Sequence, residues 1–131
     1  MRGLYGVAVI AILTVVGGCG GDASSQEAPD AVAADPQHYS VEFENDVVRV
    51  LRIRYGPGET SVMHRHPANC AIFITGASVI FQLPTGETVN AGGTPGQVLC
   101  GDAEVHLPTN TGSEANEVIV VELKGREAFS Q

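Results

Sequence analysis

Apolar residues in this chain fall in short runs, and within most runs they alternate with polar residues. The clearest run covers residues 47–55, in which Leu51, Ile53 and Tyr55 share one face of an extended chain and two arginines share the other. Glycine and proline separate the runs. The pattern predicts strands at residues 39–44, 47–55, 61–66, 70–75, 77–83, 87–90, 97–100, 105–107 and 117–124. Short, closely spaced strands of this kind are typical of an all-β sandwich or small barrel.

Composition limits both the core and the partners. The chain has 131 residues, which is enough for one domain. Aromatic residues make up 5% of the chain and tryptophan is absent, so the core must be built mainly from valine, isoleucine and leucine. The formal net charge of −8 favours solubility, and it argues against nucleic acid as a partner because it repels phosphate backbones.

The N-terminus resembles a bacterial lipoprotein signal peptide over residues 1–18. Arg2 provides a positive start, and residues 3–16 are uncharged and mostly apolar, a length that suits a signal peptide better than a membrane span. The run ends in Val16-Gly17-Gly18-Cys19, which looks like a lipobox. The resemblance implies cleavage before Cys19, a diacylglycerol on its sulfur and usually a third acyl chain on its amine, which together anchor a protein stably. The alternatives are an ordinary signal peptide with a chance cysteine and an uncleaved anchor.

Residues 19–37 are predicted to be the lipidated cysteine and a flexible tether, because they are small, polar and acidic with no periodic apolar positions. The residue after Cys19 is Gly20 rather than aspartate. If the host is Gram-negative, the usual sorting rule places such a lipoprotein in the outer membrane, on the periplasmic side. The predicted partner is therefore a membrane of the bacterial cell envelope, reached through the lipid. The folded domain is expected at residues 38–125, followed by a tail at 126–131.

Two of the four histidines form a pair on a predicted strand. His64 and His66 are two residues apart, so a strand directs both imidazoles to one face, where they can bind one metal ion. Without its context, the pair fits two polar residues on a solvated face equally well. His38 has no partner at a telling spacing and is expected to be an exposed histidine near the domain edge.

The context of the pair resembles the first conserved motif of the cupin superfamily. That motif is a glycine, five residues and His-x-His, followed by a glutamate and a glycine. Here Gly58 is followed after five residues by His64, Arg65 and His66, and Gly76 comes later.

The second cupin motif has a similar counterpart. It is a glycine, five residues, Pro-x-Gly, a histidine, three residues and an asparagine, and the segment from Gly96 to His106 and Asn110 resembles it. The resemblance covers residues 39–124. It implies a single cupin-like jelly-roll β-barrel with a metal in its mouth, bound by His64, His66 and His106.

The chain departs from both motifs. The carboxylate of the first motif is missing, and Cys70 stands about where it belongs; Asp102-Ala103-Glu104 replaces the Pro-x-Gly turn of the second. Two residues are candidates for a fourth ligand. Glu104 is two residues before His106 and would share its strand face. Cys70 could bind as a thiolate, which would favour softer ions.

Cys70 has a second interpretation. After lipidation of Cys19, the remaining thiols are Cys70 and Cys100, and the envelope compartment is oxidising. In the jelly-roll order that the resemblance implies, the two cysteines lie near each other on neighbouring strands. A Cys70–Cys100 disulfide is therefore the favoured alternative to a thiolate ligand.

The resemblance does not decide between two classes of function, a metal-binding protein that acts on or binds a small molecule and a non-catalytic lipoprotein. Three histidines suit a divalent transition metal such as Zn, Fe, Mn, Cu or Ni, and they do not distinguish among these ions. One hypothesis is a membrane-tethered metal-binding cupin that acts on or binds a small molecule, with catalysis undecided. The alternative is a non-catalytic ligand-binding or structural envelope lipoprotein with a degenerate metal site. Cupins often pair through edge strands, which implies a homodimer.

Overall fold

The strands predicted from the alternating pattern all form. A computed structural model describes residues 28–129, and within them the chain makes nine strands and one short helix. Their bounds are α1 Ala31–Ala34, β1 Tyr39–Glu44, β2 Val48–Tyr55, β3 His64–His66, β4 Asn69–Phe73, β5 Val79–Gln82, β6 Thr88–Asn90, β7 Val98–Gly101, β8 Glu104–Asn110 and β9 Asn116–Leu123. The third strand is shorter than predicted and the eighth is longer.

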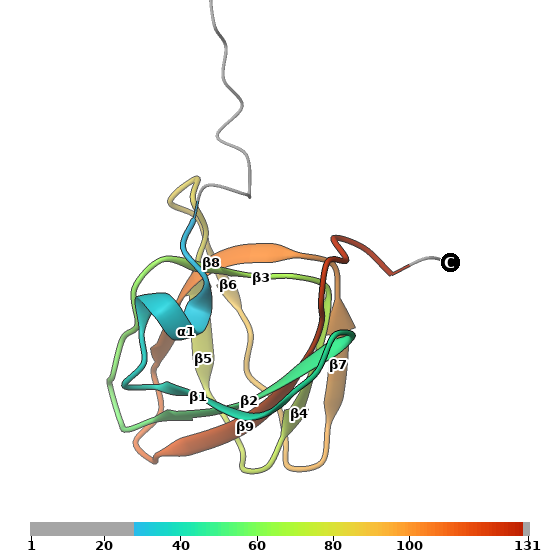
Figure 1. The fold of residues 1–131 in the computed structure, drawn as a ribbon. Helices are drawn as coiled ribbons and strands as arrows, with labels where there is room; N and C mark the ends of the chain where they lie inside the picture. Colours follow the sequence, from blue (N-terminus) through green and yellow to red (C-terminus); the bar gives the residue numbers. More distant parts are fainter. Residues whose placement is uncertain (1–27, 130–131) are drawn as a thin grey trace, which may run out of the picture.

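The strands form two antiparallel sheets that close into a jelly-roll barrel (Figure 1). One sheet has the order β1-β2-β9-β4-β7 and the other has the order β3-β8-β5-β6. Strands that are far apart in the sequence are therefore neighbours, as β2 and β9 are. This confirms the all-β fold class and the barrel that the resemblance implied.

The core follows the alternation of β2 and β9. Leu51 pairs with Val120 and Ile53 pairs with Val118, and these side chains point into the barrel. Leu51 is completely buried. Burial of apolar surface at these inward positions is the main stabilising contribution to a barrel of this size.

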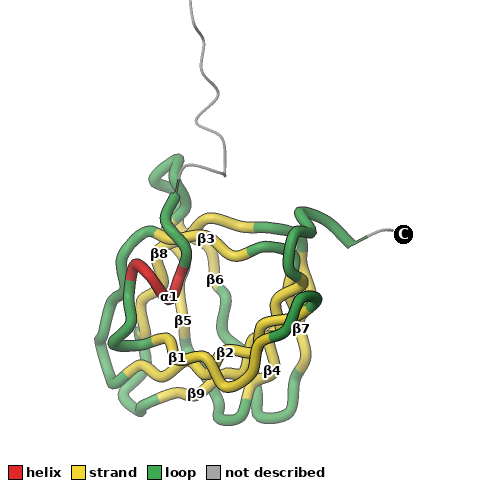
Figure 2. The backbone as a smooth tube through the Cα atoms, in the orientation of Figure 1, coloured by secondary structure: helices red, strands yellow, loops and turns green. Residues whose placement is uncertain are grey.

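Helix α1 closes the side of the barrel between β1 and β3 (Figure 2). Asp30 is its N-cap, and the Asp30 carboxylate accepts hydrogen bonds from the backbone N–H groups of Val32 and Ala33. Ala31 is fully buried against the core. The prediction of a flexible tether over 19–37 is therefore wrong for residues 30–37, because a buried alanine and a capped turn bind this segment to the barrel.

The C-terminal segment also belongs to the folded domain. The backbone carbonyl of Arg126 accepts a hydrogen bond of 2.8 Å from the N–H of Ala68, and that of Glu127 accepts one of 2.7 Å from the N–H of Ala103. The expected boundary at residue 125 is thus too early.

The predicted signal peptide, the lipidation site Cys19 and the first part of the tether lie outside the described residues. Among residues 28–129, no helix has the length and apolar character needed to cross a membrane.

Candidate metal centre

Pairing of β3 with β8 brings the predicted histidines together. His64 lies opposite His106, and His66 lies opposite Glu104. The inward faces of both strands carry these residues, and the three histidines are almost completely buried. One nitrogen from each histidine lies within 4.8 Å of the others, which makes this a group that could hold a metal ion.

His64 is fixed in one tautomer by a backbone carbonyl. Its Nδ1 lies 2.7 Å from the carbonyl oxygen of Val62, and a carbonyl only accepts, so Nδ1 carries the proton. Burial, together with neighbouring His66 and His106, lowers the pKa of His64 to about 4. At neutral pH the ring is therefore uncharged, and Nε2 presents a lone pair.

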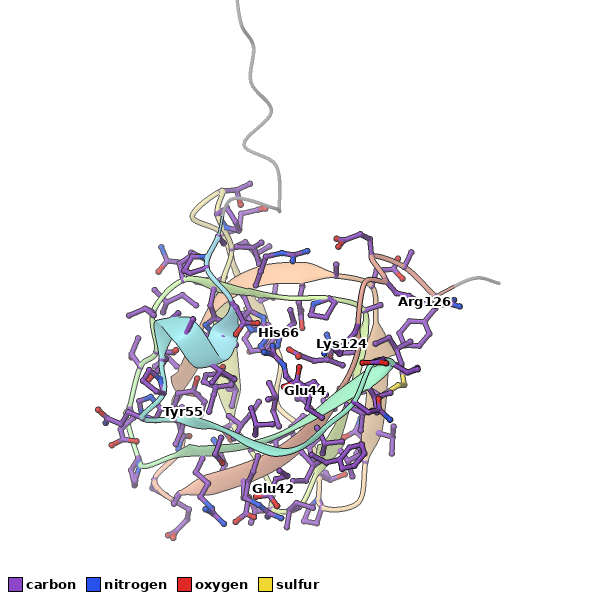
Figure 3. All side chains as sticks on the ribbon, in the orientation of Figure 1. Glu42, Glu44, Tyr55, His66, Lys124 and Arg126 are labelled. Atoms are coloured by element: carbon purple, nitrogen blue, oxygen red, sulfur yellow. A yellow bond between two sulfur atoms is a disulfide. The ribbon has the colours of Figure 1, made fainter. Side chains whose placement is uncertain are left out.

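His66 is fixed in the same way by a buried carboxylate. The side chain points into the barrel (Figure 3), and its Nδ1 donates a hydrogen bond of 2.6 Å to Oε1 of Glu122 on β9. Burial raises the pKa of Glu122, but hydrogen bonds from His66 and Arg49 outweigh this effect and the pKa is lowered. The carboxylate is thus ionised and accepts the proton of Nδ1, which turns Nε2 of His66 toward His64.

Glu122 is itself held from its other side. Its Oε2 accepts a hydrogen bond of 2.6 Å from Nε of Arg49, and Arg49 also forms an ion pair with Asp30 at the start of α1. A chain of charge-assisted hydrogen bonds therefore runs from Asp30 through Arg49 and Glu122 to His66. The sequence analysis missed this chain. The sequence does contain a sign of this chain. Arg49 on β2 and Glu122 on β9 are charged residues at inward positions, two residues from the apolar pair Leu51 and Val120.

The Nε2 atoms of His64 and His66 face each other. They are 3.1 Å apart, a hydrogen-bond distance at which Nε2 of His64 accepts a proton carried by Nε2 of His66. A metal ion bound by both atoms would take the place of that proton. With metal–nitrogen bonds of about 2.1 Å, two ligands at right angles lie about 3.0 Å apart and two at the tetrahedral angle lie about 3.4 Å apart. The observed separation therefore fits two ligands of one ion.

His106 completes the group from β8. Its ring packs against Phe81 with 3.9 Å between ring centroids, and Oε2 of Glu104 lies 3.4 Å from its Nδ1. Within the described residues, Nδ1 has no hydrogen bond. Burial lowers the pKa of His106, although Glu104 opposes that shift. Glu104 therefore stands beside His106 on the same face, as its spacing predicted.

Cys70 does not line the site. It forms a disulfide with Cys100 across the β4–β7 pair, with their Cα atoms 4.0 Å apart. The alternation of β4 turns Asn69 and Ala71 inward and Cys70 outward. The hypothesis of a thiolate ligand is therefore wrong in this structure, and no carboxylate occupies the inward position beside it.

His38 is not the exposed residue that was expected. Its side chain is 9% exposed, and its ring lies between the carboxylates of Asp35 and Glu59, with Nδ1 at 2.7 Å from Asp35 and Nε2 at 3.0 Å from Glu59. The ring stacks on Tyr55 at 4.4 Å. His38 joins the N-terminal segment to the barrel and lies outside the metal group.

A cavity of about 230 Å³ adjoins the histidines. Its wall is mainly apolar, with Phe73, Val118 and Val120 among the lining residues. His66, His106 and Glu104 form part of the same wall. A ligand in this cavity would thus reach the metal group.

Solved cupin-domain and double-stranded β-helix proteins resemble this barrel. A cupin domain from Bordetella pertussis Tohama I matches with a TM-score of 0.61 and 22% identity, over 76% of this chain and 98% of that one. A protein with a double-stranded β-helix domain from Klebsiella pneumoniae matches with a TM-score of 0.52 and 20% identity, over 70% of this chain and 75% of that one. No model of a protein family matches the sequence, and no curated protein matches it.

The fold defines the class as a small double-stranded β-helix barrel. More particularly, the chain has the fold of the cupin superfamily, as its two histidine motifs indicated.

Proposed function

We propose that this chain is a membrane-tethered cupin that binds one divalent transition metal through His64, His66 and His106 and takes a small molecule into the adjoining cavity. The main support is the pair of Nε2 atoms 3.1 Å apart, which are turned toward each other because each ring donates Nδ1–H to an oxygen. Metal-binding histidines in proteins are usually oriented by this kind of second hydrogen bond.

Glu122 compensates in part for the missing carboxylate of the first motif. A carboxylate that accepts the Nδ1–H of His66 makes the imidazole more basic and lowers the net positive charge of a metal-loaded site. It does so without contacting the ion. Glu104, which lies beside His106 in the cavity wall, is the candidate for a direct fourth ligand.

The donor set limits the chemistry. Three imidazoles suit Zn, Fe, Mn, Cu and Ni alike. An ion held by the three histidines would supply Lewis-acid chemistry at the edge of the cavity. The residues of this chain would orient the ligands and exclude water from around the bound molecule.

The proposed location is the bacterial cell envelope. The lipobox ending at Cys19 supports a lipid anchor there, and the acidic residues that follow it support a short tether. The barrel then faces the periplasm when the host has an outer membrane.

Elemental analysis of the purified chain tests metal binding. The full chain in detergent should carry about one equivalent of a transition metal, and a His64→Ala/His66→Ala variant should lose it. His38→Ala is the matched control, because His38 lies outside the group, and it should keep the metal. If the chain stays metal-free after incubation with Zn, Mn, Fe(II), Ni and Cu, the site is vestigial and the non-catalytic envelope lipoprotein becomes the better proposal.

A further inference from the structure

Asn116 is a buried polar residue of the cavity wall whose side-chain donor has no partner among the described residues. Asn116, the first residue of β9, is 4% exposed and lines the cavity beside the histidines. Within the described residues, its Nδ2 makes no hydrogen bond. Leaving a buried amide donor unpaired costs folding free energy, so such a group in a native structure requires an explanation.

The other buried asparagines differ in this respect. Asn110 donates from Nδ2 to the carbonyl oxygens of Gly56 and Glu114, at 2.9 Å and 2.8 Å. Asn69 donates from Nδ2 to the carbonyl oxygen of Pro67 at 2.9 Å. The barrel therefore satisfies Asn69 and Asn110 from its own backbone, whereas the side-chain donor of Asn116, in the wall of the cavity, has no partner among the described residues.

The surroundings of Asn116 specify the rest of that ligand. Along β9 the cavity wall continues from Asn116 through Val118 to Val120, a span of about 13 Å at roughly 3.3 Å per residue. The wall contains no lysine or arginine, and Glu104 is its one carboxylate. A neutral oxygen acceptor on an apolar body fits these walls, because no side chain of the wall offers a cation that would pair with an anion.

We propose that the cavity binds a small, mainly apolar and neutral molecule whose carbonyl or ether oxygen accepts a hydrogen bond from Nδ2 of Asn116. The inference deepens the proposed function and rests on it, since the molecule occupies the cavity that adjoins the metal group. The size is suitable, because an apolar cavity of about 150 Å³ already accommodates benzene and this one has about 230 Å³.

Two probes of matched shape test the proposal. Acetophenone carries a carbonyl oxygen, and α-methylstyrene carries a CH₂ group in its place. Binding of both to the full chain is followed by NMR in the presence of a metal chelator, so a failure of the metal site leaves the result intact. We expect acetophenone to bind up to about tenfold more tightly than α-methylstyrene, and the side-chain amide signal of Asn116 to shift further downfield with acetophenone than with α-methylstyrene.

Asn116→Leu is the decisive variant, because leucine has nearly the shape of asparagine and no donor. It should bind both probes equally and be at least as thermally stable as the parent, since the unpaired amide costs folding free energy. Asn90→Leu, at an exposed asparagine outside the cavity wall, should keep the preference for acetophenone. Equal binding of the two probes by the parent chain, binding of neither, or a preference that survives in Asn116→Leu would each overturn the proposal.

Discussion

His66 and Glu122 form a hydrogen bond of 2.6 Å between two side chains that are 3% and 1% exposed. One is a residue of the proposed metal group and the other lies on the strand across the barrel. Because water has almost no access to the pair, the orientation of His66 depends on this carboxylate.

Glu122→Gln should weaken metal binding about 10-fold to 100-fold, because the amide keeps the shape but loses the charge that polarises His66. Competition against a chelating dye measures the affinity. Glu117→Gln is the matched control, since Glu117 on the same strand pairs with Arg52 and Arg54 on the outer face. Unchanged affinity in Glu122→Gln would show that the carboxylate has no part in the site.

The disulfide should stabilise the barrel by constraining β7. This strand pairs only with β4 in its sheet, and Cys70–Cys100 links the two across a separation of 30 residues. A closed loop of this length is worth about 3.5 kcal/mol in the chain-entropy estimate. Urea unfolding of Cys70→Ala/Cys100→Ala should show a loss of about 2 to 4 kcal/mol. Reduction of the parent chain should give a similar loss and leave the variant unchanged, and no effect of reduction on the parent would refute the prediction.

Asp35 should give the domain a dependence on acid pH. Its carboxylate accepts hydrogen bonds from Ser61 at 2.5 Å and from His38 at 2.7 Å. Burial raises the pKa of Asp35, but these hydrogen bonds outweigh it and the pKa falls below 3.8. A pKa lower in the folded than in the unfolded chain stabilises the fold above pH 4, and this contribution is lost as the pH falls through the folded value.

Asp35→Asn should therefore lower the free energy of unfolding by about 1 to 3 kcal/mol at neutral pH, with the difference from the parent shrinking below pH 4. Denaturant unfolding at a series of pH values measures this. Asp46→Asn, at an exposed position, should follow the parent curve at every pH. A difference that stays constant down to pH 2 would contradict the mechanism.

Lipidation of Cys19 can be tested by cell fractionation and by mass spectrometry of the N-terminus. The parent chain expressed in a bacterial host should be found in the membrane fraction, with an N-terminal mass that includes the diacylglycerol. Cys19→Ser should lack that mass. If the parent carries an unmodified Cys19, the lipobox interpretation fails while the barrel and its metal site are unaffected.

Most of the fold could be predicted because the alternation of apolar and polar residues is recognisable even in short segments of the sequence. Each of the nine strands was predicted, because short runs of alternating residues are separated by glycine and proline, as in β2, where Leu51 and Ile53 point inward. Helix α1 was missed because its four residues, Ala31–Ala34, are too few to show a helical period. The helix is stabilised by a tertiary contact, the burial of Ala31 against the core, which the sequence pattern does not show.

The site was predictable to the extent that motifs encode it. The spacing of His64 and His66 placed both on one face, and the resemblance supplied His106. Glu122 and Arg49 belong to no motif, and only the pairing of β2 with β9 shows that both point inward. Cys70 was placed at the missing carboxylate by counting along the chain, but the alternation of β4 turns it outward.

The ion pair between Asp30 and Arg49 has a consequence for where the chain can be cut. Asp30 belongs to the segment that precedes the first strand, yet it forms an ion pair with Arg49, which in turn forms an ion pair with Glu122. A protease cut or a truncation between residues 30 and 37 would leave every strand of the barrel intact. It would nevertheless remove Asp30, the far end of the chain of ion pairs that orients His66, so the segment before the first strand also supports the metal group.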